Sequence, residues 1–298
     1  MPDPLTQTLR LGRLTVHAIQ AGLQHLDGGA MFGVVPKPLW ERRIPADARN
    51  RIPLGMRCLL VEHDDGLVLV DTGLGNKEDA KFRDIYGVEN AGAEGATRLE
   101  DGIRSLGYQL ADVRRVVLTH LHFDHAGGAT RRDPDGAVRP AFPNARYTVQ
   151  RGEWDYATHP NERTGASYLP PNFAPLAAAG VLDLVGGDVE VVPGLHVVPA
   201  PGHTPHHSVV RLTSAGESLL FLADLVPTAA HLPLPWIMGY DVEPLVTLET
   251  KRRLLARAEA EGWLLVFEHD ATVPWGRLAH DGRQYVLAPE RSAADPVA

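Results

Sequence analysis

Residues 116–125 read Val-Val-Leu-Thr-His-Leu-His-Phe-Asp-His, an apolar run followed by three histidines and an aspartate within six positions. Side chains of an extended strand repeat with a period of two, so His120 and His122 point the same way and can reach one metal ion. Asp124 and His125 follow, before two glycines that allow a sharp turn, and can serve a second ion. The stretch therefore predicts a metal site at the end of a strand, with a histidine-rich surface turn as the alternative.

The whole chain has 298 residues, 44% of them hydrophobic, a net charge of -8 and a single cysteine, Cys58. This length and composition predict one domain, 1–298, that buries a substantial core. The negative charge disfavours nucleic acid as a partner. One cysteine excludes an intrachain disulfide and a thiolate-rich metal site, and its strand-like surroundings favour a buried structural thiol.

The chain shows no sign of export or membrane insertion in its sequence. Its start lacks a basic region followed by an apolar stretch, and no apolar run approaches the ~20 residues that span a bilayer. We therefore expect a cytoplasmic protein that has no membrane partner and acts on a small-molecule substrate.

Helical and strand-like segments alternate along the chain, a pattern typical of α/β proteins. A glycine-rich loop is expected at 28–33 and a loop-like stretch at 159–175. Helices are expected at 98–106, 152–157 and 247–261, where helical spacing ends near a glycine or a loop. Strands are expected at 9–20 (a pair broken at Gly12), 56–62, 67–71, 113–119, 146–150, 189–192, 195–199, 209–212, 219–223 and 263–267.

Polar residues able to bind metal recur where these apolar strands end. Asp71, Asp224 and His269 each follow a strand, and His203 lies in the turn after another. A carboxylate at the end of a buried strand needs a partner, and a metal-bound histidine usually donates its free ring N–H to one. We therefore expect Asp71 to orient a histidine rather than to bind metal.

Seven of these side chains form a complete ligand set for two ions that share a carboxylate, and neutral imidazole with carboxylate suits zinc, iron, manganese or cobalt. Such residues can converge at one edge of stacked sheets, where the strands supply rigidity. We assign His120, His122 and His203 to the first ion, Asp124, His125 and His269 to the second, and Asp224 to the bridge between them.

In this order, the motifs around Asp71, residues 120–125, His203, Asp224 and His269 resemble those of the metallo-β-lactamase superfamily, over about 9–286. The resemblance implies a four-layer αββα sandwich, an α/β (α+β) fold with two sheets inside and helices outside, and a dinuclear site that usually holds zinc. It further implies hydrolysis by a hydroxide that bridges the metals. Asp124 is then the expected catalytic residue, which orients the hydroxide and helps to protonate the leaving group.

Four groups within this superfamily resemble the chain less well, because their ligands or added regions differ from it. Dizinc β-lactamases carry cysteine where Asp224 stands, and flavodiiron proteins carry glutamate where His122 stands. Glyoxalase II adds a C-terminal helical region for which the 29 residues after His269 are too few, and RNA-processing members add a basic insertion. The chain is most similar to the branch that contains acyl-homoserine lactonases and methyl parathion hydrolase, although His206 stands where the second glycine of the branch's Gly-His-Thr-Pro-Gly-His motif is usual. His207 is expected to be a structural partner, because the ligand set is already complete.

These features predict a dinuclear metal-dependent hydrolase of lactones or carboxylic esters, with phosphotriesters as further substrates. The alternatives are a mononuclear iron sulfur (persulfide) dioxygenase of the same fold and a non-catalytic binding module. Residues 21–50 are expected to form a pocket loop or the interface of a homodimer. The expected substrate pocket consists of Met31, Phe32, Trp40, Tyr168, Phe173, His231 and Trp236.

Overall fold

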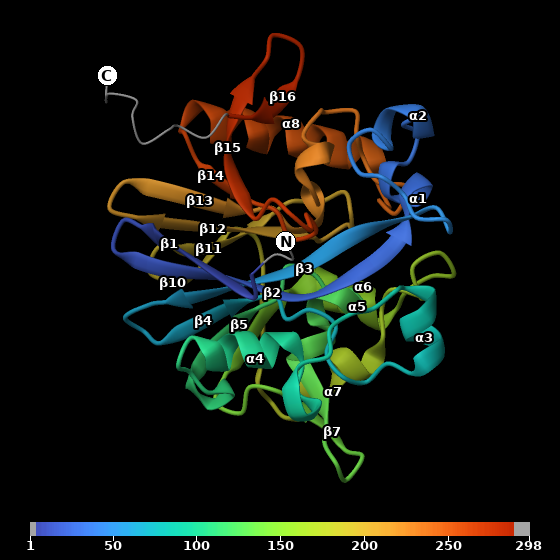
Figure 1. The fold of residues 1–298 in the computed structure, drawn as a ribbon. Coiled ribbons are helices and arrows are strands. Elements are labelled where there is room, and N and C mark those ends of the chain that lie inside the picture. The colour runs from blue at the N-terminus through green and yellow to red at the C-terminus, as the bar shows by residue number, and fades with distance from the viewer. Residues whose placement is uncertain (1–3, 289–298) are drawn as a thin grey trace.

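Two β-sheets pack face to face in the computed structural model, which describes residues 4–288 (Figure 1). The first sheet has the strand order β1-β2-β3-β4-β5-β8-β9. In this sheet β1, β2, β3 and β4 pair antiparallel in succession, whereas β4, β5, β8 and β9 pair parallel. Their bounds are β1 (Thr6–Leu11), β2 (Leu14–Asp27), β3 (Arg51–Glu62), β4 (Leu67–Val70), β5 (Val113–Val117), β8 (Arg146–Gln150) and β9 (Leu182–Val185).

The second sheet has the order β10-β11-β12-β13-β14-β15-β16 and is antiparallel except between β13 and β14. Its strands are β10 (Val189–Val192), β11 (Leu195–Pro199), β12 (Ser208–Ser214), β13 (Glu217–Phe221), β14 (Leu264–Val266), β15 (Trp275–His280) and β16 (Tyr285–Leu287). A separate hairpin pairs β6 (Thr130–Arg132) with β7 (Val138–Pro140).

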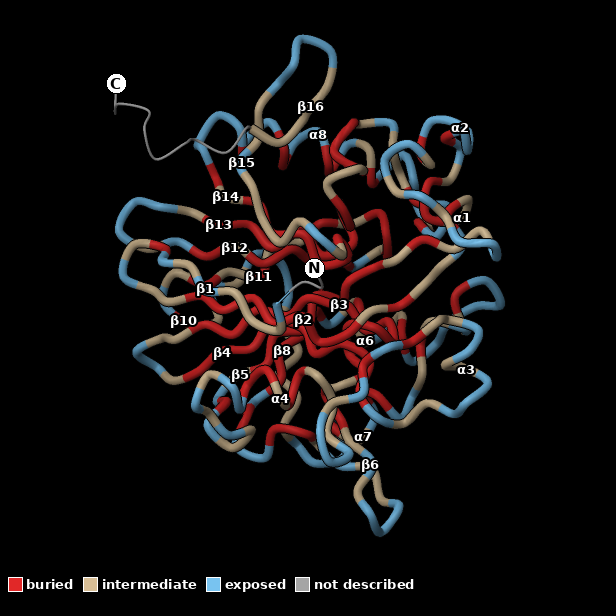
Figure 2. The backbone as a smooth tube through the Cα atoms, in the orientation of Figure 1, coloured by how far each residue is buried: buried red, intermediate tan, exposed pale blue. Residues whose placement is uncertain are grey.

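The strands of the first sheet are apolar on both faces, so their alternate residues fill two different cores. Along β3, Leu59 and Val61 belong to the core between the sheets, where they meet residues such as Val210 and Phe221. Cys58 and Leu60 face the opposite way into the core beneath the helices. Figure 2 shows the buried backbone concentrated in these two sheets.

Helices cover the outer face of each sheet, so the predicted four-layer αββα sandwich is confirmed (Figure 1). Leu99 and Ile103 of α4 pack on the first sheet, and Leu254 and Leu255 of α8 pack on the second. Helix α4 begins at a capping box in which Thr97 and Glu100 satisfy each other's backbone N–H groups. The helices are α1 (Gly28–Phe32), α2 (Lys37–Trp40), α3 (Ala80–Ile85), α4 (Arg98–Ser105), α5 (Phe123–Ala126), α6 (Arg151–Thr158), α7 (Ala174–Ala178) and α8 (Pro244–Ala260).

The strands and helices expected in the sequence are present, with two notable differences at the N-terminal end. Strand β2 continues to Asp27 instead of ending near Gln20. The glycine-rich stretch after it is helix α1 rather than a loop, because the Asp27 side chain accepts the backbone N–H of Ala30 and caps a helical turn. Residues 21–50 therefore contain a strand end and two short helices instead of a continuous loop.

Two further expectations concern the single cysteine and membrane-spanning helices. Cys58 is fully buried, as predicted, and burial raises the pKa of its thiol well above its usual value. Among the helices of residues 4–288, we find none with the length and apolar character needed to cross a membrane.

Strand direction brings the polar chain segments together at one edge of the stacked sheets. Strands β4 and β5 are parallel, so Asp71 and His120 follow them at the same edge. Strands β13 and β14 are also parallel, so Asp224 and His269 leave the second sheet side by side. The fold therefore gathers residues more than a hundred positions apart around one point.

Candidate metal centre

The segment 120–125 is fixed against the loop that follows β4. A Cβ atom on Gly127 would lie 2.1 Å from the Leu74 carbonyl oxygen, and one on Gly128 would lie 2.1 Å from that of Thr72. The φ angle of Gly127 is -59°, which any residue can adopt. The two glycines therefore allow the loops to approach closely, and the 3-10 turn at Gly127–Ala129 does not depend on glycine's backbone freedom at Gly127.

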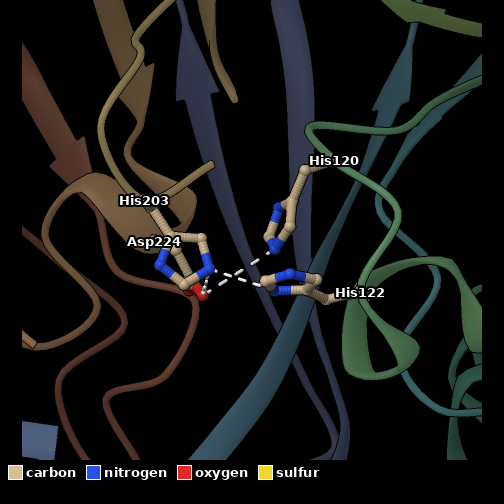
Figure 3. A group of neighbouring side chains, drawn as sticks. All are labelled: His120, His122, His203 and Asp224. Carbon is tan, nitrogen blue, oxygen red and sulfur yellow. Dashed lines mark hydrogen bonds and ion pairs between the residues drawn. The ribbon is translucent and has the colours of Figure 1, made fainter. Parts of the chain in front are cut away.

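The first group of potential ligands consists of His120, His122, His203 and Asp224 (Figure 3). One ligand atom from each lies within 4.8 Å of the others. The Nε2 atom of His203 is 3.1 Å from His122 Nδ1 and 3.0 Å from Asp224 Oδ2. His120 Nε2 lies 3.8 Å from the same carboxylate oxygen. Three imidazole nitrogens and one oxygen thus surround a common point.

The second group consists of Asp124, His125 and His269. The Nε2 atoms of His125 and His269 are 3.1 Å apart. Both face the other oxygen of Asp224, with Oδ1 2.9 Å from His269 Nε2 and 3.5 Å from His125 Nε2. The Asp224 carboxylate therefore lies between the groups, with one oxygen toward each.

The donor atoms of both groups fit bound cations. His120 Nε2 is buried and has no hydrogen-bond partner among residues 4–288, and a buried polar atom without a partner is costly. Neutral imidazoles facing one another through their ring nitrogens, together with carboxylate oxygens, match the ligand preferences of zinc, iron, manganese and cobalt. The arrangement can hold two divalent ions.

Several histidines of the site have strongly shifted pKa values. Burial holds the pKa values of His120 and His122 well below their usual range. Burial also opposes the charged forms of His203 and His269, but the adjacent Asp224 carboxylate outweighs it and raises their pKa values to about 10 and about 9. Because metal-bound imidazole must be neutral, metal binding has to displace protons here.

Asp71 lies beyond the two groups and orients His125. Its Oδ2 accepts hydrogen bonds from His125 Nδ1 at 3.0 Å and from the Thr119 hydroxyl at 2.7 Å, while Oδ1 accepts the Thr119 backbone N–H at 2.8 Å. Bonding at Nδ1 turns Nε2 of His125 toward the site. Asp71 has a φ of 53° and Ala223, beside Asp224, a φ of 44°, conformations that are strained outside glycine and occur at functional sites.

Glu268 is a second carboxyl group on His125, and the sequence analysis missed it. Its Oε2 is 3.0 Å from His125 Nδ1, the same nitrogen that Asp71 binds. Burial raises the pKa of Glu268 well above its usual value, since the positive charge of His125 offsets only part of that cost. One ring N–H cannot fully satisfy two buried carboxylates, so burial and the nearby Asp71 carboxylate favour the neutral form of Glu268.

Further hydrogen bonds fix the remaining histidines. His203 Nδ1 donates to Asp241 Oδ1 at 2.9 Å, and His269 Nδ1 donates to the Gly55 carbonyl at 2.7 Å. His207 donates to the Ala200 carbonyl and accepts the Asp224 backbone N–H at 3.2 Å. Burial lowers the pKa of His207 to about 3, so the ring is neutral and holds the Asp224 loop, the structural role that we expected.

His206, the departure from the usual motif glycine, is accommodated by a glycine elsewhere. A Cβ on Gly152 of α6 would lie 2.4 Å from His206 Nδ1, so the imidazole ring occupies the space that a side chain at position 152 would take. The turn therefore forms with histidine at this position.

Glu153 joins three segments beneath the site, and its role was also missed. Its carboxylate accepts the backbone N–H of Leu121 at 3.1 Å and the hydroxyls of Tyr168 at 2.9 Å and Thr204 at 2.6 Å. It therefore ties the loop of His120 and His122 to the turn of His203.

A cavity of about 410 Å³ opens onto both groups of ligands. His122, His203, Asp224, Asp124 and His269 line one side. The other side is largely apolar and includes Leu26, Met31, Leu54, Phe123, Met238 and Val242, with Gln24, Tyr86, Arg163 and Tyr240 among the polar members.

Of the seven residues expected to form the substrate pocket, Met31 lines this cavity. Phe32, Trp40 and His231 are buried behind it, where Phe32 stacks on His231 with ring centroids 4.3 Å apart. Trp236 packs edge-on against Phe32 in the same cluster. Tyr168 and Phe173 belong to the core under the first sheet, and Tyr168 contacts the His122 ring from there. These six residues are not among those that line this cavity, and they pack behind its walls.

The sequence model of the metallo-β-lactamase superfamily matches residues 53–269. The chain belongs to the metallo-β-lactamase superfamily. Within the superfamily it is 32% identical over 217 residues to a probable metallo-hydrolase of Mycobacterium tuberculosis, an alignment that covers 65% of this chain and 66% of that relative. It is 30% identical over 229 residues to an N-acyl homoserine lactonase of a Bacillus species, covering 74% of this chain and 82% of the lactonase.

Two solved structures are similar to this fold. A probable metal-dependent hydrolase from Staphylococcus aureus superimposes with a TM-score of 0.84 at 29% identity, covering 95% of this chain and all of the other. An N-acyl homoserine lactone hydrolase with N-hexanoyl-L-homoserine bound at its catalytic metal centre superimposes with a TM-score of 0.64 at 25% identity, covering 88% and 94% of the two chains.

Proposed function

We propose that this superfamily member is a dinuclear metal-dependent hydrolase of lactones or carboxylic esters, with phosphotriesters as secondary substrates. The observation that carries the proposal is the position of Asp224, whose two oxygens face two separate groups of ligand atoms at one side of a largely apolar cavity. A single-metal site needs no carboxylate shared in this way.

His120, His122 and His203 would hold one ion, Asp124, His125 and His269 the other, and Asp224 would bridge them. When bound, two divalent ions supply a water molecule of lowered pKa and polarise the carbonyl oxygen under attack. Zinc fits the nitrogen-rich ligand set best, and iron, manganese and cobalt fit it as well.

Asp124 is the acid–base residue of this proposal. It lines the cavity, and its Oδ2 accepts a hydrogen bond from the Gln24 side-chain amide, which fixes the carboxylate. From this position it can orient the attacking water and then deliver a proton to the alcohol oxygen that leaves as the acyl C–O bond breaks. A lactone would open to a hydroxy acid, and an open-chain ester would give an acid and an alcohol.

The apolar side of the cavity suits the acyl part of such a substrate. Its volume of about 410 Å³ lies in the range of small-molecule sites, and Met31, Leu54 and Met238 offer it apolar surface. The relatives named as N-acyl homoserine lactonases support an acylated lactone as the first substrate to test.

The test is turnover by protein loaded with zinc or manganese on acyl lactones, aryl esters and a dialkyl aryl phosphate. We expect metal-dependent hydrolysis of a lactone or ester, lost in His203→Asn and retained in His196→Asn, whose histidine lies in β11 away from the cavity. Absence of hydrolysis in every class would contradict the proposal. One iron per chain with oxygen uptake on a persulfide would favour the dioxygenase instead.

A further inference from the structure

Gln24 is a polar residue of β2 that the structure places in an unusual position. Its side chain is 0% exposed, yet it lines the cavity beside the metal centre. The pairing of β2 with β3 shifts between Gln20, which pairs with Arg57, and Leu23, which pairs with Gly55. The bulge adds one residue to β2, so the side chains after it point to the opposite face from the one they would occupy in a regular strand. Gln24 and Leu26 then line it together, with Leu54 paired opposite Gln24.

The two ends of the Gln24 amide differ sharply. Nε2 donates a hydrogen bond to Asp124 Oδ2, inside the cavity. Oε1 is buried and accepts no hydrogen bond from any residue of 4–288. The amide of this cavity-lining residue is thus fixed by its donor end, and its acceptor end is left unsatisfied.

An unsatisfied buried carbonyl costs stability, so such an atom in a folded protein calls for an explanation. Leu26 in β2 and Leu54, which pairs with Gln24 from β3, carry no side-chain hydrogen-bond donor, and no other residue of 4–288 donates to Oε1. A molecule bound in the cavity can supply one. Since Gln24 is one hydrogen bond from Asp124, a donor that reaches Oε1 must lie near the carbonyl group that reacts.

We propose that Gln24 is a specificity-determining residue that also positions Asp124, an inference that rests on the proposed hydrolase function. Its Oε1 accepts a hydrogen bond from an N–H or O–H group of the substrate close to the scissile carbonyl, while Nε2 holds the Asp124 carboxylate. The site then selects lactones and esters that carry such a donor over analogues that lack it, and over phosphotriesters, which have none.

The experiment uses two matched ligands that cannot be hydrolysed. One is 2-(hexanoylamino)cyclopentanone, in which a ring CH₂ replaces the lactone ester oxygen. The other is its N-methyl derivative, which lacks the N–H donor. Dissociation constants are measured by calorimetry on zinc-loaded protein, alongside kcat and KM for the parent lactone, zinc content and thermal unfolding.

The wild type should bind the N–H ligand about 10- to 100-fold more tightly than the N-methyl ligand, as expected for satisfying a buried acceptor. Gln24→Met, of similar volume, should lose most of this preference. Gln24→Glu keeps an acceptor oxygen but places a second carboxyl group against Asp124, and the two must share a proton, so it should keep the preference while the disturbed ionisation of Asp124 lowers kcat for the lactone about 10-fold or more. The control Leu26→Ala shortens the adjacent apolar wall and should weaken both ligands alike.

Equal affinity of the wild type for the two ligands, or an unchanged preference in folded Gln24→Met, would overturn the inference. So would loss of the preference in folded, zinc-replete Gln24→Glu. These results are distinct from failure of the proposed function. Lactone turnover without ligand preference leaves the hydrolase proposal standing, whereas a Gln24-dependent preference without turnover of any ester removes the hydrolase and keeps the recognition role.

Discussion

The two walls of the cavity are built in different ways. The ligand wall, which contains His122, Asp124, His203, Asp224 and His269, follows strand ends and is fixed by hydrogen bonds to the His203 and His269 imidazoles. The apolar wall, which contains Met31, Leu54 and Met238, is supported by side-chain packing on Phe32 and Trp40. We infer that the ligand wall sets the reaction and the apolar wall sets the acyl group, so substitutions in the two should affect different quantities.

The largest effect is expected from Asp224→Asn on the ligand wall. The amide keeps the shape but removes the charge that faces both groups of ligands. We expect kcat/KM to fall by more than the roughly 10- to 100-fold typical of residues that only orient a ligand, with zinc content reduced. Kinetics and elemental analysis measure the two effects, and a variant with full zinc content and activity would contradict the assignment.

Two carboxyl groups beside His125 should differ in their effect on zinc affinity. Asp71→Asn removes the charged partner of the Nδ1–H group and should weaken zinc binding by about 10- to 100-fold. Burial raises the pKa of Glu268 and favours its neutral form, so Glu268→Gln should weaken binding by less than about 10-fold. Competition with a chromophoric chelator gives both affinities. A larger loss in Glu268→Gln than in Asp71→Asn would refute this difference.

The apolar wall depends on a buried cation behind it. Lys251 is 0% exposed and donates to the carbonyls of Pro233 at 2.8 Å and Trp236 at 2.9 Å. Burial lowers the pKa of Lys251 to about 7, against the attraction of Asp241. Between pH 7 and its usual pKa, the unfolded chain therefore binds more protons than the folded chain. The free energy of unfolding should therefore increase as the pH is raised across this window and decrease as the pH is lowered to 7.

Lys251→Met provides the comparison, because methionine fills similar space without a titrating group. From pH 7 to pH 9, the free energy of unfolding of the wild type should rise by about 2 kcal/mol relative to this variant, measured by urea unfolding. Parallel pH profiles for the two proteins would show that Lys251 stays charged throughout.

The smallest effect is expected from Met31→Ala, on the cavity surface of the apolar wall. It should raise KM about 10-fold for long acyl chains, with little change for short ones and none in zinc content. The neighbouring Phe32 is buried, so Phe32→Leu should lower the free energy of unfolding by about 1–3 kcal/mol and leave the chain-length dependence of KM unchanged. The reverse pattern would mean that the walls are assigned wrongly.

The difference between the ligand wall and the apolar wall also explains which residues could be predicted from the sequence. The ligand wall was predictable because its residues occupy strand ends in short motifs, and the fold followed from their order. Met31 and Phe32 are adjacent and similar in type, yet one lines the cavity and the other is buried, which only the packing of α1 decides. Gln24 and Glu268 depend on a strand bulge and on a contact across the site, so neither left a local signal.

Other expectations remain predictions. The seven ligand assignments are supported by geometry but await a bound metal. The one-domain organisation, the homodimer through residues 21–50 and the cytoplasmic location also stay open to experiment. Within 21–50, Val34 and Leu39 are exposed, as an interface would require.

The shared carboxylate of Asp224 is the centre of this account, and anomalous diffraction from crystals of the zinc-loaded protein tests it most directly. We predict two zinc peaks, one among His120, His122 and His203 and one among Asp124, His125 and His269, with Asp224 contacting both. A single peak at full occupancy in zinc-saturated crystals, with the other group of ligands unbound, would contradict it.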